Sequence, residues 1–144
     1  FVEKRKAATP MKVFVKGIVT AQDAAQCIAR GADGIVVSNH GGRADESGRG
    51  AIDCLPEIAR EVRKRIPVIL DSGVRRGTDV FTALALGADA VGIGRPYLWG
   101  LGAFGEAGVA RVLRLLKAEL RTVMAIGGTR ALADIGTDSV MRAT

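Results

Sequence analysis

One short polar run of the chain combines a proton acceptor with a fixed cation. Residues 38–43 read S-N-H-G-G-R and close an apolar stretch, and His40 is the only histidine in the sequence. Histidine is the side chain most easily tuned to act as a base near neutral pH. The planar fork of Arg43, three residues on, can hold a carboxylate through two hydrogen bonds. His40 alone would more often be structural, but the pair predicts removal of a proton from an anionic substrate.

Two glycine-rich turns with arginines indicate a phosphate site. The first, D-S-G-V-R-R-G, begins at Asp71, and the second, G-R-P, begins at Gly94. Gly73 lets the backbone approach an oxyanion, and we expect the helix that follows to present unpaired amides and the positive end of its dipole. Arg75 and Arg95 add positive charge. One such turn would be weak support, but two in successive loops favour binding of a phosphate group.

Lys16 follows an apolar stretch, where a lysine is usually a salt-bridge partner or functional. Beside a phosphate-bearing cofactor, Lys16 becomes a candidate to stabilise negative charge.

The elements that must position these residues alternate along the chain. Strands are predicted at residues 13–17, 34–38, 67–71 and 90–94, and helices at 20–31, 53–65 and 77–86. Thr20 is the predicted N-cap and Gly31 the predicted stop of the first helix. Residues 96–108 are expected to form a short helix or irregular connection in which Tyr97 and Trp99 are buried. A long amphipathic helix at 110–126, ended by two glycines, and a short helix at 129–135 complete the prediction.

Four strand–helix units in succession predict half of a (β/α)8 TIM barrel, followed by a C-terminal helical segment at 96–144. Active sites of such barrels lie at the carboxyl ends of the strands, which is where all the residues singled out above fall. The phrase Gly-Ala-Asp precedes both the second and the fourth strand, and we interpret this repeat as architectural only.

Composition narrows the class of protein. The chain has 144 residues, 48% of them hydrophobic but only 4% aromatic, which predicts an aliphatic α/β core. The net charge of +6 could indicate nucleic acid, but the basic residues form no single aromatic-bearing stripe. A cluster of them is expected to lie on a solvated helix face: Arg60, Arg63, Lys64 and Arg65.

The cysteines and the hydropathy pattern predict a cytoplasmic protein. Cys27 and Cys54 lie in predicted helices without metal-ligand spacing, so two reduced, partly buried thiols are expected. We find no secretory leader, expect no transmembrane helix and assign no metal site. Membrane association by other means stays open.

The ordered motifs V-K-G-I, S-N-H-G-G-R, D-S-G-V-R-R-G and G-I-G-R-P resemble the C-terminal half of the FMN-dependent α-hydroxy acid oxidising family, over residues 13–135. This family includes glycolate oxidase, lactate oxidase, mandelate dehydrogenase and flavocytochrome L-lactate dehydrogenase. The resemblance implies oxidation of a small L-2-hydroxy acid to the 2-oxo acid, with FMN as cofactor. Residues 1–12 are expected to fit the family poorly.

The resemblance also implies roles for individual residues. His40 would be the base and Arg43 the carboxylate clamp. Lys16 would stabilise the reduced flavin, and Ser38 would hydrogen-bond it. The remaining contacts would go to the ribityl chain and the phosphate: Asp71 to the former, and Gly73, Arg75, Gly94 and Arg95 to the latter.

Two departures from the family matter. Ala44 stands where the family usually has glutamine, and the first half of the barrel is absent. Because four units leave open sheet edges, we expect a second polypeptide to supply the complementary N-terminal half-barrel, and the complete enzyme to be a homo-oligomer. One alternative is a half-barrel that binds FMN or a partner without turnover. Another is a different FMN barrel, such as an isopentenyl diphosphate isomerase, but that class lacks S-N-H-G-G-R.

Overall fold

The computed structural model describes residues 1–43 and 47–141, and its centre is a parallel sheet in the order β1-β2-β3-β4. The strands are β1 (Phe14–Ile18), β2 (Gly34–Val37), β3 (Val68–Leu70) and β4 (Ala90–Val91). Each successive pair is parallel and is connected by one helix. The four predicted strand–helix units are therefore present, although the fourth strand is shorter than predicted.

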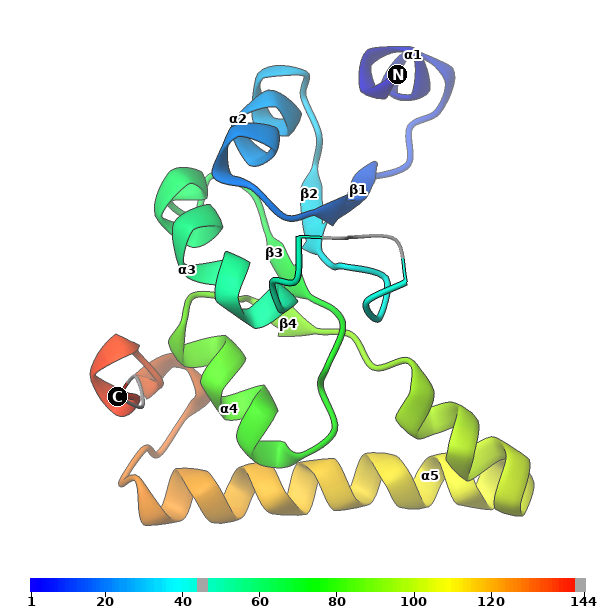
Figure 1. Cartoon of the computed structure of the whole chain (residues 1–144), viewed down its shortest axis with the longest axis vertical. Helices are drawn as coiled ribbons and strands as arrows, with labels where there is room; N and C mark the ends of the chain where they lie inside the picture. The colour runs from blue at the N-terminus through cyan, green and yellow to red at the C-terminus, as the bar shows by residue number, and fades with distance from the viewer. Residues whose placement is uncertain (44–46, 142–144) are drawn as a thin grey trace.

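The connecting helices all pack on the same side of the sheet, at the left in Figure 1. They are α2 (Ala21–Ala29), α3 (Ala51–Val62) and α4 (Gly77–Ala85). Alternate strand residues such as Val37 and Leu70 are at most 1% exposed and pack with Leu55 and Ile58 of α3 in one core. A sheet covered in this way directs its carboxyl-end loops to one rim.

The helix boundaries confirm some predictions and correct others. Thr20 caps α2 as predicted, because its side chain accepts a hydrogen bond from the Asp23 amide at 3.1 Å. The helix predicted at 53–65 instead covers Ala51–Val62. It ends early because Arg63 and Lys64 both adopt left-handed backbone, with φ of 50° and 57°.

The segment after β4 is more helical than predicted. Residues Arg95–Ile126 form α5, which bends where Phe104 and Gly105 leave helical geometry. The part before the bend folds back along the part after it (Figure 1). Tyr97 and Trp99, predicted to be buried, are 37% and 57% exposed because the helix turns them away from the core. The second part ends at Ile126, as predicted.

Short helical segments lie at both ends of the described chain. Helix α1 (Val2–Ala8) precedes β1, and its Val2 is buried in the main core. The helix predicted at 129–135 is only a 3-10 turn, η1 (Leu132–Asp134), followed by η2 (Thr137–Ser139). Asp134 accepts the Ala131 amide at 2.9 Å at the start of the turn, and the turn stops because the backbone of Ile135 is extended, with φ of -77° and ψ of 115°.

The repeated Gly-Ala-Asp phrase joins neighbouring strands at their amino ends. Asp33 donates its amide to Val13 O (2.9 Å) and accepts the Val13 amide on Oδ2 (2.8 Å). Asp89 makes the same pair of bonds with Val68, at 2.7 and 2.8 Å. Each carboxylate also meets a lysine at 2.7 Å: Lys6 for Asp33 and Lys64 for Asp89. The repeat is thus a structural clamp used twice.

Cys27 and Cys54 are buried in α2 and α3, and the described residues contain no disulfide. In the same part of the chain, no helix is long and apolar enough to cross a membrane. Nor does any group of three or more histidine, cysteine and acidic side chains there come together to hold a metal ion.

Candidate functional site

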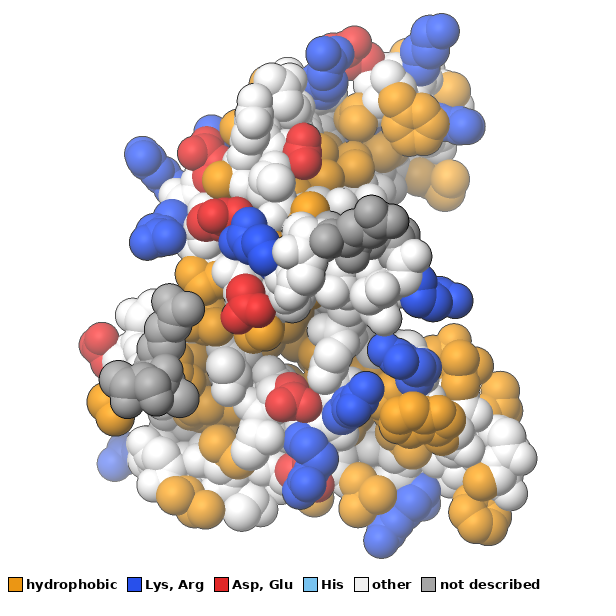
Figure 2. Space-filling model, viewed as in Figure 1, with side chains coloured by type: hydrophobic (Ala, Val, Ile, Leu, Met, Phe, Trp, Pro, Cys, Tyr) orange, Lys and Arg blue, Asp and Glu red, His pale blue; other side chains and the backbone are white. Residues whose placement is uncertain are grey.

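A pocket of about 390 Å³ lies at the carboxyl ends of the strands and contains most of the predicted site. This volume is within the range of ligand sites, roughly 300–1,000 Å³. Eight of the nine predicted residues line the pocket: Lys16, His40, Arg43, Asp71, Gly73, Arg75, Gly94 and Arg95. Figure 2 shows basic side chains gathered where the loop after β2 faces α5. The pocket wall therefore carries four permanent cations and one carboxylate, which favours an anionic ligand.

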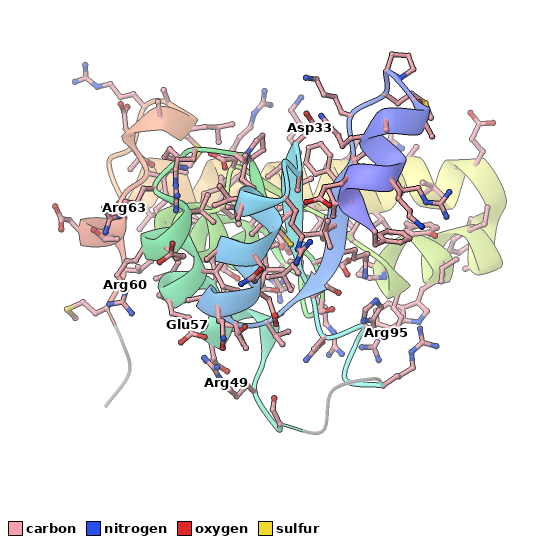
Figure 3. All side chains as sticks on the ribbon, turned by 90° about the horizontal axis from the view of Figure 1, so that it is seen from above. Asp33, Arg49, Glu57, Arg60, Arg63 and Arg95 are labelled. Atoms are coloured by element: carbon pink, nitrogen blue, oxygen red, sulfur yellow. The ribbon has the colours of Figure 1, made fainter. Side chains whose placement is uncertain are left out.

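The other basic residues lie elsewhere. In Figure 3, Arg60 and Arg63 lie along α3 on one side of the molecule, whereas Arg95 lies on the opposite side. Arg60 in α3 is exposed, and so are Arg63, Lys64 and Arg65, which follow the end of the helix. The four are solvated as predicted, but only Arg60 lies on a helix face, and the positive charge of the pocket is a separate feature.

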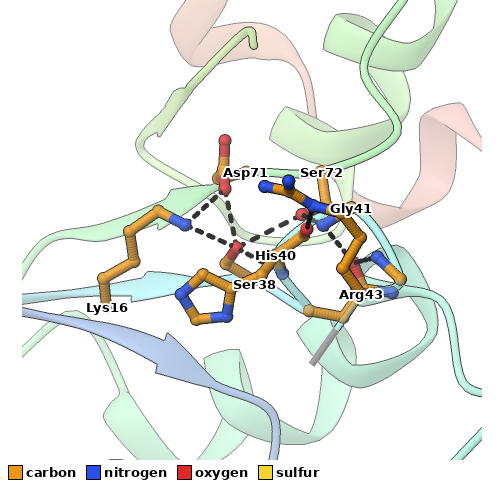
Figure 4. A network of polar contacts seen from close by, with 9 residues as sticks. Lys16, Ser38, His40, Gly41, Arg43, Asp71 and Ser72 are labelled. Carbon is orange, nitrogen blue, oxygen red and sulfur yellow. Dashed lines mark hydrogen bonds and ion pairs between the residues drawn. The ribbon is translucent and has the colours of Figure 1, made fainter. Parts of the chain in front are cut away.

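A hydrogen-bonded ion pair forms the floor of the pocket (Figure 4). Lys16 Nζ lies 2.9 Å from Asp71 Oδ2 and 2.9 Å from Ser38 Oγ, and Ser38 Oγ donates to Asp71 Oδ2 at 2.6 Å. Burial alone would raise the pKa of Asp71, but the hydrogen bonds from Ser38 and Lys16 outweigh it and lower the pKa. Asp71 is therefore ionised and fixes the Lys16 ammonium at the floor of the pocket.

Ser38 stands behind this ion pair and does not line the pocket. Its side chain is 1% exposed, and besides Lys16 and Asp71 it receives the His40 amide at 3.1 Å. A hydroxyl has one hydrogen and two lone pairs, so these contacts saturate it. Ser38 is thus the only predicted site residue that the structure places outside the pocket lining.

The His40 side chain is positioned by a glycine that sequence reasoning left without a role. Gly17 lies at a register shift of β1, between Lys16 and Ile18, and has φ of 92°. A β-carbon on Gly17 would stand 2.9 Å from His40 Cε1, closer than real contacts allow. A glycine inside a predicted strand was the available signal, because it marks a bulge or a close approach.

The turn after β2 brings Arg43 back toward His40. Asn39 Oδ1 accepts the amides of Gly41 and Gly42, both at 3.1 Å, and closes the turn. Arg43 Nε then donates to the His40 carbonyl at 3.2 Å. The base candidate and the cation candidate therefore face one pocket from one turn. Asn39, like Gly17, is a contributor that the sequence analysis did not single out.

The loop after β3 departs from one prediction. The Arg75 and Arg76 amides donate to Asp79 Oδ2 at 2.8 and 2.9 Å, and the Gly77 amide donates to Glu119 Oε2 at 2.7 Å. The first amide of α4, that of Gly77, is thus already paired, which corrects the prediction that the helix start presents only unpaired amides.

Open space for an anion is present instead beside the two glycines of the predicted phosphate site. A β-carbon built on Gly73 or Gly94 would meet no atom within 4 Å. The start of α5 lines the pocket, and no side chain in the described part of the chain caps it. Unpaired amides at a helix start attract anions. Together with the Arg75 and Arg95 guanidiniums, this arrangement fits a phosphate group.

Comparison with known proteins agrees with this site. The family model of FMN-dependent dehydrogenases matches residues 2–142. An L-lactate oxidase of Lactobacillus jensenii is 52% identical over 134 residues, which cover 93% of this chain and 33% of the oxidase. A peroxisomal (S)-2-hydroxyacid oxidase of Arabidopsis thaliana is 50% identical over 139 residues, covering 96% of this chain and 38% of the oxidase.

A solved structure extends the likeness to the fold. A soluble mutant of the membrane-associated (S)-mandelate dehydrogenase from Pseudomonas putida superposes with a TM-score of 0.91 at 43% identity, covering 99% of this chain and 40% of that one. The predicted partial TIM barrel is thereby confirmed. The matched range of the family model begins at residue 2, within the segment 1–12 for which a poor fit was predicted. The chain spans between a third and two fifths of the curated relatives it matches.

Proposed function

The chain belongs to the family of FMN-dependent dehydrogenases, and from this premise we propose that it forms part of an enzyme that oxidises an L-2-hydroxy acid to the 2-oxo acid. The observation that carries this proposal is the shared pocket. His40 and Arg43 line it together with Gly73, Arg75, Gly94 and Arg95. A base, a carboxylate clamp and an anion site thus meet at one rim.

The FMN phosphate is assigned to the loops after β3 and β4. Gly73 and Gly94 leave open space there, and Arg75 and Arg95 supply the positive charge. Asp71 is assigned to the ribityl chain, because its carboxylate accepts hydrogen bonds and lines the pocket. The phosphate would meet guanidinium groups rather than the start of α4, whose first amide is occupied.

Lys16 would stabilise negative charge on the flavin from the floor of the pocket. Its ammonium is held in place by Asp71 and Ser38, both at 2.9 Å. A direct hydrogen bond from Ser38 to the flavin stays a prediction from the resemblance. The contacts of Ser38 favour a role through Lys16 and Asp71 instead.

Bound FMN would supply the redox chemistry by accepting two electrons. The chain's own residues would handle position and protons. Arg43 would pair with the substrate carboxylate, which fixes the α-carbon next to the His40 imidazole. Conversion of the alcohol to the ketone releases two electrons and two protons, and His40 would take one of these protons as base.

The remainder of the barrel would complete the site. Within the described residues β1 pairs only with β2, and β4 pairs only with β3, so each has an edge without a strand partner. Further strands of an eight-stranded barrel would pair with these edges and wall the pocket. We assign them to the complementary N-terminal half-barrel, either continuous with this chain or as a second polypeptide, in a homo-oligomeric enzyme.

A colour change tests the proposal. The FMN-loaded protein, purified with the rest of its barrel, should be yellow and should bleach under anaerobic conditions with L-lactate, glycolate or L-mandelate. A yellow protein that no 2-hydroxy acid bleaches would overturn the enzymatic assignment and favour a half-barrel that binds FMN or a partner without turnover.

A further inference from the structure

We propose that Ser72 is a positioning residue that ties the turn carrying His40 to the loop after β3. Ser72 belongs to the β3 loop, yet its Oγ accepts the Gly41 amide at 3.1 Å and lies 3.2 Å from Ser38 Oγ. Gly41 immediately follows His40 in the turn after β2. A single hydroxyl therefore bridges two neighbouring loops at the rim (Figure 4).

Counting protons and lone pairs identifies the bond that ties the loops. Ser38 has one hydroxyl hydrogen, and it points to Asp71 Oδ2 at 2.6 Å, because an ionised carboxylate can only accept. Both lone pairs of Ser38 Oγ already accept, one from Lys16 Nζ and one from the His40 amide, so the 3.2 Å approach of Ser72 Oγ is a polar contact without a further hydrogen bond. The hydrogen bond between the two loops is therefore the one from the Gly41 amide to Ser72 Oγ.

The backbone conformation of Ser72 is strained for a residue that carries a side chain. Its φ is 85°, a left-handed conformation that glycine adopts with far less strain. A glycine would suit this backbone better but has no hydroxyl to accept the Gly41 amide. The presence of a serine and not a glycine at this position is therefore best explained by the hydrogen bond that its hydroxyl forms.

This inference rests on the proposed function, because it links the loop assigned to the FMN phosphate with the proposed base. Gly73 follows Ser72 directly and Arg75 lies three residues on, so the bond between Ser72 and Gly41 would couple the position of this loop to the backbone next to His40. The bond at Gly41 would hold the His40 imidazole at a fixed position relative to a ligand bound in the pocket.

Two variants separate the hydroxyl from the backbone strain. Ser72→Ala removes the bond from the Gly41 amide and keeps the strain, whereas Ser72→Gly removes the same bond and relieves the strain. In the complete FMN-loaded enzyme, both should lower the rate of flavin reduction at saturating 2-hydroxy acid by about three- to tenfold, as expected for one lost hydrogen bond. Hydrogen exchange of peptides covering residues 38–43 should accelerate in both, and both should retain FMN.

Ser139→Ala is the matched control, because Ser139 Oγ also accepts a backbone amide, that of Gly136 at 3.3 Å, far from the pocket. It should change neither the reduction rate nor the exchange of residues 38–43. If Ser72→Gly matches the wild type in both measurements, or if both Ser72 variants lose FMN, the positioning role is wrong. If the wild-type enzyme is not reduced by any 2-hydroxy acid, the proposed function fails, while the exchange data still decide whether Ser72 couples the loops.

Discussion

The imidazole of His40 lies over Gly17, at a spacing that leaves no room for a β-carbon. Such a carbon would stand 2.9 Å from His40 Cε1. Gly17 lies in β1 at the register shift against its neighbour β2, and His40 lies in the turn that follows β2. The position of the proposed base therefore depends on the absence of a side chain one strand away.

Gly17→Ala should disturb both the backbone and the base. The left-handed φ of 92° would be strained by alanine, which costs about 1–2 kcal/mol of stability, and the new methyl group would displace the imidazole. We expect a lower denaturation midpoint and a flavin reduction rate at least tenfold lower. Gly31→Ala is the control, because Gly31 has a φ of 77° and nothing within 4 Å of the added carbon. It should lose stability only; equal losses of activity in the two variants would contradict the steric argument.

His40→Ala should abolish proton removal while leaving the cofactor in place. General-base catalysis typically contributes on the order of 10²–10⁴-fold, so anaerobic bleaching of the flavin should slow by about that factor. The measurement is stopped-flow reduction with the FMN content determined in parallel. Loss of FMN from this variant would indicate a structural histidine.

Arg43→Lys should weaken substrate binding, because an ammonium cannot form the two parallel hydrogen bonds that a guanidinium forms with a carboxylate. Hydrogen bonds to charged groups contribute about 1.5–3 kcal/mol, so KM for the hydroxy acid should rise by roughly 10- to 100-fold. FMN affinity should stay unchanged. A large loss of FMN affinity with an unchanged KM would show that Arg43 binds the cofactor and not the substrate.

Arg75→Gln should weaken FMN but not riboflavin, which lacks the phosphate. The same range of about 1.5–3 kcal/mol for a charged hydrogen bond predicts FMN binding roughly 10- to 100-fold weaker. Titration of the apoprotein with both flavins measures the difference directly. Arg60→Gln, on the exposed side of α3, is the control and should change neither affinity. If both flavins weaken equally in Arg75→Gln, the phosphate assignment is wrong.

Stability should fall in acid through Asp33. The hydrogen bond from Lys6, that from the Val13 amide and the charges of Lys6 and Lys12 lower the pKa of Asp33 to about 2. Because the folded pKa lies below the ordinary value of 3.8, the ionised form stabilises the fold above pH 4. This contribution should disappear between pH 4 and about pH 2. Urea midpoints should show this loss in the wild type and not in Asp33→Asn, with the exposed Asp138→Asn behaving like the wild type.

Local signals in the sequence were sufficient for most of the architecture. The strand–helix alternation, the Thr20 cap and the end of the long helix at Ile126 all follow from short-range chemistry, and all are confirmed. Most residues named from local motifs line one pocket, because a parallel sheet gathers the carboxyl ends of its strands at one rim.

The errors concern contacts between distant parts of the chain. Glu119 occupies the Gly77 amide from 42 residues away, which no local pattern reveals. Exposed Trp99 lies in the part of α5 before the bend, where Phe104 and Gly105 both leave helical geometry and Gly105 has φ of 59°. The closeness of Gly17 and His40 likewise depends on pairing of two strands.

The twin aspartate clamps have a consequence for how such a protein can diversify. Asp33 and Asp89 fasten the strands at the end opposite the rim that carries His40 and Arg43. The contacts that fasten the strands and the residues that line the pocket thus lie at opposite ends of the sheet. Under the proposed function, substitutions in the rim loops would change which acid binds and would leave the two aspartate clamps as they are. Loss of a clamp would lower the stability of the fold through contacts that lie outside the pocket.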